Sequence, residues 1–207
     1  MSKISLISIT CVVMFSAIVW WQGTNGFQAF TSETARRLDV LESPRTLSNL
    51  SFKNQENKSI NFSDYQGKVV LVDFIYTSCP DVCHALGFSI KSIKNDLKKS
   101  SLEDKIQIAN ITFDLENDTP KKLDAYVKRY SKNTITWHGL RLKDPKSLSQ
   151  LLTDFGVVVI PNEQEGFDHN AAIHLLDQNG RLIGIYDHQA HDQIVDHIHK
   201  QTKARRL

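Results

Sequence analysis

The sequence predicts an α/β domain in which helices flank a central mixed sheet. The first observation is the continuous, valine-rich apolar run from Lys68 to Tyr76, which is typical of a strand buried on both faces. The second is the run of apolar residues spaced by three and four that follows it, which predicts an amphipathic helix. The third is the pair Asn179-Gly180 between two further apolar runs, which marks the turn of a hairpin.

Composition allows one ordinary domain and a short appendage. The chain has 207 residues, of which 41% are hydrophobic and 23% are charged, so it can bury a core of its own. Its 25 basic and 23 acidic residues are spread along the sequence and give a net charge of +2. Without a concentrated basic region, we expect no nucleic-acid partner.

The amino-terminal segment differs from the rest of the chain. Residues Ile4 to Trp21 carry no charge, Lys3 precedes them, and two tryptophans end the run. This length and the terminal tryptophans favour a membrane anchor, and the missing A-x-A site favours an uncleaved one. Cys11 is an apolar position within this run, because the residues before it make a poor lipoprotein signal.

The expected organisation has three parts. Residues 1–22 form a transmembrane anchor or uncleaved signal, residues 23–49 form a polar tether, and residues 50–207 form the folded domain. The positive charge before the anchor places the domain outside the cytoplasm. The compartment is then the bacterial periplasm or, in a eukaryote, the mitochondrial intermembrane space.

The helix after the first strand has one apolar stripe and one polar side. The stripe comprises Val82, Leu86, Ile90, Ile93 and Leu97, and the polar side comprises Lys91, Lys94, Asn95 and Lys98. A second strand is expected at Ile106–Phe113. The run Asp118-Thr119-Pro120 then predicts a helix start, with threonine as the cap and proline in the first turn.

The remaining elements complete a layered fold. They are a strand at Trp137–Leu142, a helix at Pro145–Phe155 ended by Gly156, an apolar stretch at Val157–Ile160, a loop at Pro161–Asn170, strands at Ala171–Leu176 and Arg181–Tyr186, and a helix at Gln189–Thr202. The order of strands and helices followed by a hairpin and a helix indicates a thioredoxin-like fold. In this fold, a helix begins shortly after the end of the first strand.

Cys79 and Cys83 stand at this helix start. Residues four apart share one face of a helix, where two thiols are able to bind a metal together or, with some backbone adjustment, form a disulfide. The helix N-terminus should lower the thiol pKa. A purely structural disulfide is disfavoured, because closing so short a loop removes little unfolded-state entropy.

The spacing argues against three common redox uses. Thioredoxin-type enzymes place two residues between their cysteines, whereas three residues, Pro80-Asp81-Val82, separate these. The threonine that a peroxiredoxin places three positions before its cysteine is absent. Covalent haem attachment requires Cys-x-x-Cys-His, and Cys83-His84 ends a motif that is one residue too long.

The run "GKVVLVDFIYTSCPDVCHALG" strongly resembles the Sco/SenC family of copper-handling proteins of cytochrome c oxidase assembly. The stretches "FKNQENKSINFSDYQGK", "ITFDLENDTPKKLDAYVKRY" and "DHNAAIHLLDQNGRLIGIYD" agree with it in order, so the resemblance covers roughly Leu50 to the C-terminus. It implies that Cys79, Cys83 and His169 are metal ligands. His84 and Leu115 stand where family members usually have proline, and neither change removes an implied ligand.

The donor chemistry agrees with copper. Two thiolates and one imidazole suit Cu(I), which accepts three ligands, whereas structural zinc normally takes four. Cu(II) would bind with an added oxygen or nitrogen donor. A site with three protein ligands is open, which suits a carrier that passes its ion to a partner.

The other candidate residues have alternative roles. His169 lies in a polar loop, and the strand after this loop is expected to lie beside the cysteine-bearing strand. His174 belongs to the strand after the loop and is expected to be a packed or edge residue there. His84 should point about 100° away from Cys83 around the helix. Asp114 either tunes the ligands or caps a turn. The carboxy-terminal histidines are either exposed helix residues or a weak second copper site; they are His188, His191, His197 and His199.

The expected function is that of an extracytoplasmic copper chaperone and not an enzyme, so no catalytic residue is assigned. The resemblance implies delivery to the copper subunit of cytochrome c oxidase or a related terminal reductase. A thiol-reducing protein is a further expected partner, because an oxidising compartment converts a dithiol to a disulfide. The alternatives are a thiol-disulfide oxidoreductase, with Cys79 and Cys83 as its redox-active pair, and a copper sensor.

Overall fold

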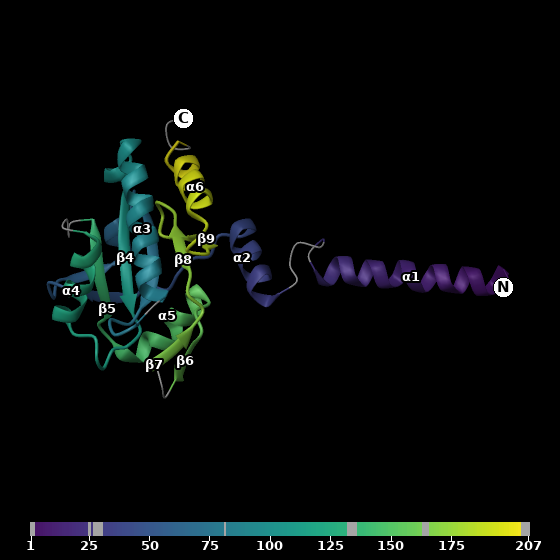
Figure 1. Ribbon diagram of the computed structural model, residues 1–207, viewed down its shortest axis with the longest axis horizontal. Coiled ribbons are helices and arrows are strands. Elements are labelled where there is room, and N and C mark those ends of the chain that lie inside the picture. The colour runs from purple at the N-terminus through teal and green to yellow at the C-terminus, as the bar shows by residue number, and fades with distance from the viewer. Residues whose placement is uncertain are drawn as a thin grey trace. The chain divides into compact units, whose positions relative to one another are not determined.

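The computed structural model describes residues 3–24, 26, 31–80, 82–131, 136–162 and 166–203, without the side chains of residues 3–6. The chain divides into two compact units, Met1–Glu42 and Ser43–Leu207. The first contains α1 (Lys3–Gly23) and α2 (Ser32–Glu42), which Figure 1 shows as two separate helices. Across the residues that the structure describes, none of the helices combines the length and hydropathy needed to cross a membrane, and the expected anchor is not confirmed.

Helix α2 lies in the segment that the sequence predicted as a tether. Its first turn carries Glu33, whose carboxylate accepts hydrogen bonds from Arg36 and Arg37. These ion pairs lower the pKa of Glu33 to about 2, against the opposing effect of its partial burial. Pairs three and four residues apart stabilise a helix, which a reading based on apolar periodicity does not detect.

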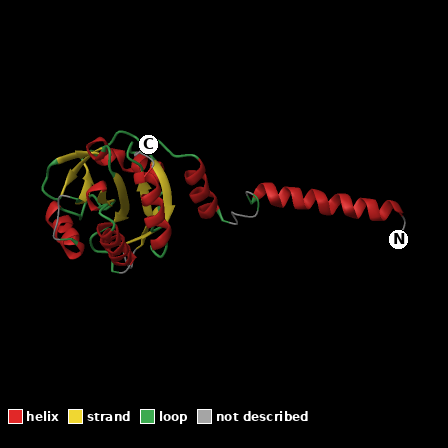
Figure 2. Ribbon diagram, turned by 90° about the horizontal axis from the view of Figure 1, so that it is seen from above, coloured by secondary structure: helices red, strands yellow, loops and turns green. Residues whose placement is uncertain are grey.

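The second unit is a mixed sheet with helices on both sides (Figure 2). Its strands run in the order β2-β1-β5-β4-β3-β8-β9. The bounds are β1 Ser51–Asn54, β2 Ser59–Asn61, β3 Val69–Ile75, β4 Ile106–Thr112, β5 Trp137–Leu142, β8 Ile173–Leu176 and β9 Leu182–Tyr186. Strands β3, β4 and β5 are parallel, and β1 and β8 are antiparallel to β5 and β3. The predicted mixed α/β architecture is therefore confirmed.

Strand β3 is the central element and is buried along its whole length. Val72 pairs with Ala109 of β4 on one side and with His174 of β8 on the other. Phe74 packs against Phe155, the last residue of helix α5 (Leu148–Phe155), with ring centroids 5.1 Å apart. Because successive side chains of a strand face opposite ways, the adjacent Asp73 points into the other layer.

The helices of this unit are α3 (Val82–Lys99), α4 (Pro120–Tyr130), α5 (Leu148–Phe155) and α6 (His191–Lys203). The caps agree with the sequence: the Thr119 hydroxyl accepts a hydrogen bond from the Lys122 amide, and Gly156 ends α5 with φ of 65°. Gly180, with φ of 78°, forms the turn between β8 and β9. These positions were predicted because each requires a particular residue type.

One residue on the predicted polar side of helix α3 is buried. Leu86, Ile90, Ile93 and Leu97 are buried, as expected. Lys94 was predicted to face solvent but is buried; its Nζ donates to the Thr136 hydroxyl over 2.8 Å and lies 5.8 Å from the centre of the Trp137 ring. A long lysine stem can cover apolar surface while its amine keeps a polar partner.

The predicted loop Pro161–Asn170 is instead largely a hairpin. Strands β6 (Val159–Asn162) and β7 (Gly166–His169) pair antiparallel in a separate two-stranded sheet, and residues 163–165 lie outside the described chain. In β7, Phe167 and His169 share one face of the strand. The strand was missed because its four residues include a glycine, an aspartate and a histidine, which are poor strand signals.

Buried polar side chains of β3, β4 and β5 form a series of hydrogen bonds. Asp73 accepts a hydrogen bond from the Asn110 amide, and Asn110 accepts one from the Trp137 indole N–H. Oδ2 of Asp73 has no hydrogen-bond partner among the described residues. Burial raises the pKa of Asp73 to about 7, although the Asn110 hydrogen bond opposes this effect. The carboxyl is therefore protonated at acidic pH in the folded chain.

We expect this carboxyl to make stability depend on pH. An unfolded aspartate has a pKa of about 3.9, so between about pH 4 and pH 7 the folded state binds one more proton than the unfolded state. The free energy of unfolding should then fall as pH rises through that window, by a few kcal/mol in all. Asp73→Asn should remove this contribution, which urea unfolding between pH 4.5 and pH 8 would measure. Parallel pH profiles for the two chains would contradict it.

Candidate metal centre

Cys79 and Cys83 lie in different kinds of backbone. Helix α3 begins at Val82, so Cys83 is helical while Cys79 belongs to the loop after β3. The expectation that both share one helical turn is wrong, because a residue before a proline, here Pro80, avoids helical backbone angles. The two remain close: the Cys83 amide donates to Cys79 Sγ over 3.4 Å. Both cysteines are buried.

A buried carboxylate fixes the loop that carries Cys79. Asp118, at the start of α4, accepts hydrogen bonds from the Thr77 amide, the Thr77 hydroxyl and the Thr112 hydroxyl. Charge-assisted hydrogen bonds are stronger than neutral ones, and Asp118 is almost fully buried. The ends of β3 and β4 are thereby tied together two residues before the first cysteine.

Helix α4 holds the second cysteine from the other side. The Tyr126 hydroxyl donates to the Cys83 carbonyl oxygen over 2.8 Å. This contact requires α3 and α4 to lie close together, and Gly87 permits it: a Cβ at this position would overlap the ring of Tyr130. The second cysteine is therefore held by packing between two helices.

His169 is the last residue of β7, and the hairpin brings it to the cysteine pair. Its Nε2 lies 3.8 Å from Cys83 Sγ. Its ring packs against Phe113, with centroids 5.2 Å apart, and against Tyr76, with centroids 6.4 Å apart. Its Nδ1 is buried without a hydrogen-bond partner among the described residues.

The separation of Cys83 and His169 suits two ligands of a soft metal ion. Metal–sulfur and metal–nitrogen bonds of about 2.3 and 2.0 Å at tetrahedral or trigonal angles separate the two donors by roughly 3.5 to 3.8 Å, which matches the pair Cys83–His169. Thiolates and imidazole favour copper or zinc over magnesium or calcium. Nevertheless, in the described part of the chain no three His, Cys, Asp or Glu side chains already form a metal-binding group. Within the described residues, His169 thus lies beside Cys83, but the structure does not form a complete three-residue metal site.

The surroundings of Cys83 shift the pKa of its thiol. The hydrogen bond with Cys79 and then burial raise the pKa of the Cys83 thiol above its ordinary value. This is opposite to the lowering expected from the helix start. The charged form of a group without water or a cationic neighbour is disfavoured. Because a metal binds the thiolate, loading this site must release a proton.

The remaining candidates have partners of their own. His84 lies beside the Tyr130 hydroxyl at 2.6 Å and accepts from Arg129 over 3.2 Å, so it is a neighbour of the site. Asp114 accepts hydrogen bonds from the backbone and side-chain amides of Asn117, so it caps a turn, which was one of its two expected roles. His174 is buried against Phe74 and Phe155 and is a packed residue, as predicted.

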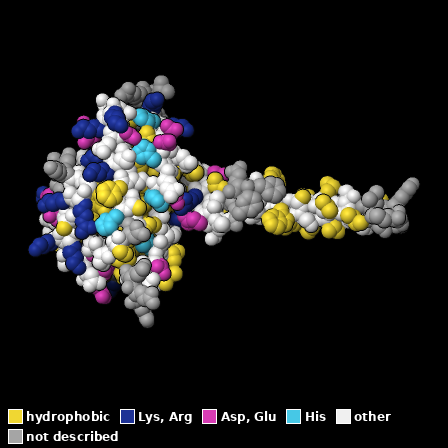
Figure 3. Space-filling view, in the orientation of Figure 1, with side chains coloured by type: hydrophobic (Ala, Val, Ile, Leu, Met, Phe, Trp, Pro, Cys, Tyr) yellow, Lys and Arg dark blue, Asp and Glu magenta, His cyan; other side chains and the backbone are white. Residues whose placement is uncertain are grey.

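The carboxy-terminal histidines do not converge. His188 and His191 lie next to different acidic residues, Asp187 and Asp96, and His197 lies beside the Tyr186 hydroxyl. On the face shown in Figure 3, histidine side chains are spread over the surface and do not gather at one point. A second copper site is therefore not supported in the described residues.

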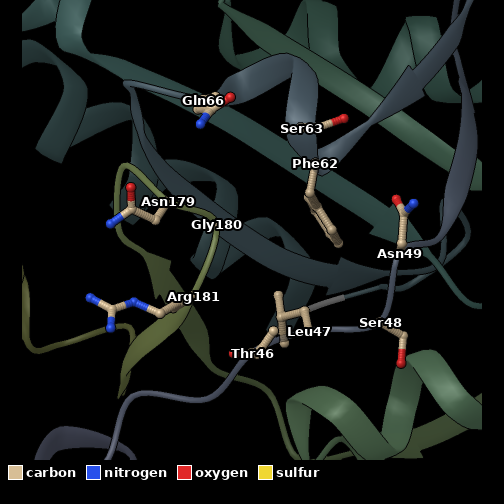
Figure 4. A pocket seen from close by; sticks show the side chains of 10 residues that line it. All are labelled: Thr46, Leu47, Ser48, Asn49, Phe62, Ser63, Gln66, Asn179, Gly180 and Arg181. Carbon is tan, nitrogen blue, oxygen red and sulfur yellow. The ribbon is translucent and has the colours of Figure 1, made fainter.

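A cavity of about 230 Å³ lies elsewhere in the unit. It is bounded by residues 46–49, the turn from Phe62 to Gln66, and the β8–β9 turn. Figure 4 shows Phe62 and Leu47 pointing into it while the Arg181 side chain extends away. None of the three expected ligands lines this cavity, so it is separate from the cysteine site.

Sequence reasoning missed the residues that support the site. Asp118 was noted only as part of a helix start, although an aspartate before a capping threonine is a signal for a buried acceptor once strand ends are placed nearby. Tyr76, Phe113 and Phe167 were not singled out. They come from three separate segments, and only the fold brings them beside His169.

Comparison with known proteins points to one family. The family model described as SCO1/SenC matches residues 39–203. The SCO1 protein homolog of Bacillus subtilis is 24% identical over 153 residues, covering 72% of this chain and 78% of that protein. The chain spans 63% and 51% of the length of two further curated relatives.

Solved structures share the fold. Bradyrhizobium japonicum ScoI, solved with copper bound, is 25% identical, with a TM-score of 0.65 over 75% of this chain and 99% of that one. BsSco, a member of the Sco family of cytochrome c oxidase assembly proteins with an identified disulfide switch, is 22% identical, with a TM-score of 0.66. Its structure covers 75% of this chain and 92% of its own.

We expect Asp118→Ala to loosen the loop that carries Cys79. The substitution leaves the buried Thr112 hydroxyl and the half-buried Thr77 donors without an acceptor, so the free energy of unfolding should fall by about 3 kcal/mol. Alkylation of the reduced cysteines should also become faster. The control is Asp124→Ala, which removes an exposed ion pair with Lys128 and should cost about 0.5 kcal/mol or less. Equal effects of the two variants in urea unfolding would contradict the role of Asp118.

Proposed function

The chain belongs to the SCO1/SenC family, and we propose that it is an extracytoplasmic copper chaperone whose cargo is held by Cys79, Cys83 and His169. Delivery to the copper centre of cytochrome c oxidase or a related terminal reductase completes the proposal. Two relatives support it: ScoI of Bradyrhizobium japonicum carries bound copper, and BsSco belongs to a family of cytochrome c oxidase assembly proteins.

The observation that carries the proposal is the proximity of His169 to Cys83. Its Nε2 is 3.8 Å from Cys83 Sγ, although 86 residues separate the two in the chain. A thiol pair used only for disulfide exchange has no need of an imidazole from a distant hairpin. A pair that binds a soft cation gains a third ligand from it.

The donor set favours Cu(I) as cargo. Three ligands satisfy Cu(I) and leave one side open, so a partner's ligand is able to enter before a chaperone ligand leaves. Cu(II) would need a further oxygen or nitrogen donor. Because only the dithiol binds copper in this way, a thiol-reducing protein outside the cytoplasm is a required partner. Attachment to the membrane through residues 1–22 stays a prediction.

A thiol-disulfide oxidoreductase is the second candidate. It is favoured by the contact between the Cys83 amide and Cys79 Sγ, which shows that the two cysteines lie close together. In this role the chain would reduce the cysteines of its target, with Cys79 and Cys83 as the redox pair and no metal in the cycle. His169 would then be dispensable, which separates the two functions.

We expect His169→Ala to weaken Cu(I) binding and to leave dithiol–disulfide exchange unchanged. Loss of even a supporting residue lowers metal affinity about 10- to 100-fold, and loss of a ligand should cost at least as much. His84→Ala is the matched control, because His84 lies beside Cys83 but bonds to Tyr130 and Arg129. Anaerobic Cu(I) titration of the reduced chain and X-ray absorption of its ligands are the measurements.

The proposed ligand set fails if His169→Ala binds Cu(I) as tightly as the original chain with the same sulfur and nitrogen ligation. Loss of activity only in cysteine variants would then favour the oxidoreductase. If His84→Ala alone weakened binding, the third ligand would be reassigned.

A further inference from the structure

The hairpin that carries His169 is attached to the rest of the unit mainly by side chains. Strands β6 and β7 pair with each other, and among the described strands they form a sheet apart from the larger one. The hydrogen bond from the Tyr76 hydroxyl to the Phe167 carbonyl oxygen, at 3.4 Å, is a long one. Backbone pairing therefore does not fix where the hairpin lies.

Three aromatic rings fill the space between the hairpin and the sheet. Tyr76 follows β3, Phe113 follows β4, and Phe167 belongs to β7. Their ring centroids are 5.6 Å apart for Tyr76 and Phe113, and 5.3 Å apart for Phe167 and each of the other two. We call these residues the aromatic triad. Such pairs contribute beyond the burial of their area.

The triad also contacts the imidazole directly. Phe167 and His169 are two residues apart in one strand and so face the same side. The His169 ring packs edge-on against Phe113 and Tyr76. Gly166, with φ of 102°, starts β7, and a Cβ there would come within 3.2 Å of the Tyr76 ring. A glycine at this point lets the hairpin lie flat against that ring.

We propose that Phe167 is a positioning residue, which packs against both Tyr76 and Phe113 and thereby holds the hairpin and His169 against Cys83. When Phe167 is withdrawn, the hairpin moves away as a unit and the site is left with two thiolates. The triad thus sets how often the third ligand is in place. This inference rests on the proposed function for its consequence in metal binding, but the positioning itself concerns the metal-free chain.

The test compares Phe167→Ala with Ile160→Ala in the full chain. Ile160 is a matched control because it lies in the same hairpin, pairs with Asp168 and is 58% exposed. In the reduced, metal-free chain, NMR of the His169 ring protons should show a ring-current shift that Phe167→Ala abolishes and Ile160→Ala retains. Amide hydrogen exchange in β7 should accelerate in Phe167→Ala alone.

The second measurement is Cu(I) affinity by anaerobic competition with a chromophoric chelator. Phe167→Ala should lower it about tenfold or more, Phe167→Leu should recover most of the loss, and Ile160→Ala should leave it unchanged. In a His169→Ala background, Phe167→Ala should add less than about a twofold change, because its effect passes through the imidazole. The dithiol–disulfide midpoint potential should be the same in all of these chains.

Two results would overturn the inference. One is a His169 ring-proton shift that survives in Phe167→Ala. The other is an affinity loss of the same size with and without His169, which would mean that Phe167 only supports the fold. If His169→Ala itself left Cu(I) affinity unchanged, the proposed ligand set would fail, while the NMR measurement would still decide the position of the hairpin.

Discussion

The hydrogen bonds from Thr77 and Thr112 to the Asp118 carboxylate determine where the cysteine loop lies. They join the ends of two parallel strands to the start of α4, so the sheet, the loop and the helix are placed together. Without this acceptor, the residues between β3 and α3 would lose their tie to β4 and α4 through Thr77. The buried carboxylate also satisfies the buried Thr112 hydroxyl and the half-buried donors of Thr77.

Different forces hold the two parts of the candidate site. The cysteines are fixed by hydrogen bonds from rigid elements, with Tyr126 bonding the Cys83 carbonyl. His169 is held by apolar ring contacts at the end of a small separate hairpin. Hydrogen bonds to charged groups require particular directions, whereas apolar contacts are less directional and are easier to shift. The thiols are therefore the constant part of the site and the imidazole is the adjustable part.

Local signals in the sequence predicted most of the fold. The valine-rich strand β3, the stripe of α3, the Thr119 cap and the glycine turns each follow from residues within a few positions of one another. The site depended on the family resemblance, because nothing local connects His169 to Cys83. What was missed depends on the whole fold or on backbone rules: Lys94 is buried because of Thr136 and Trp137, and Cys79 leaves the helix because Pro80 follows it. The β6–β7 hairpin was missed because the glycine, aspartate and histidine of β7 are poor strand signals.

Gly87 limits the substitutions that this chain tolerates. It lies four residues after Cys83, and any larger residue there would overlap Tyr130 and push α4 outward. The Tyr126 hydroxyl would then lose the Cys83 carbonyl oxygen, although neither residue had been altered. Random mutagenesis should consequently find position 87 as intolerant as the cysteines themselves, and recovery from a Gly87→Ala change should come from a smaller side chain at position 130.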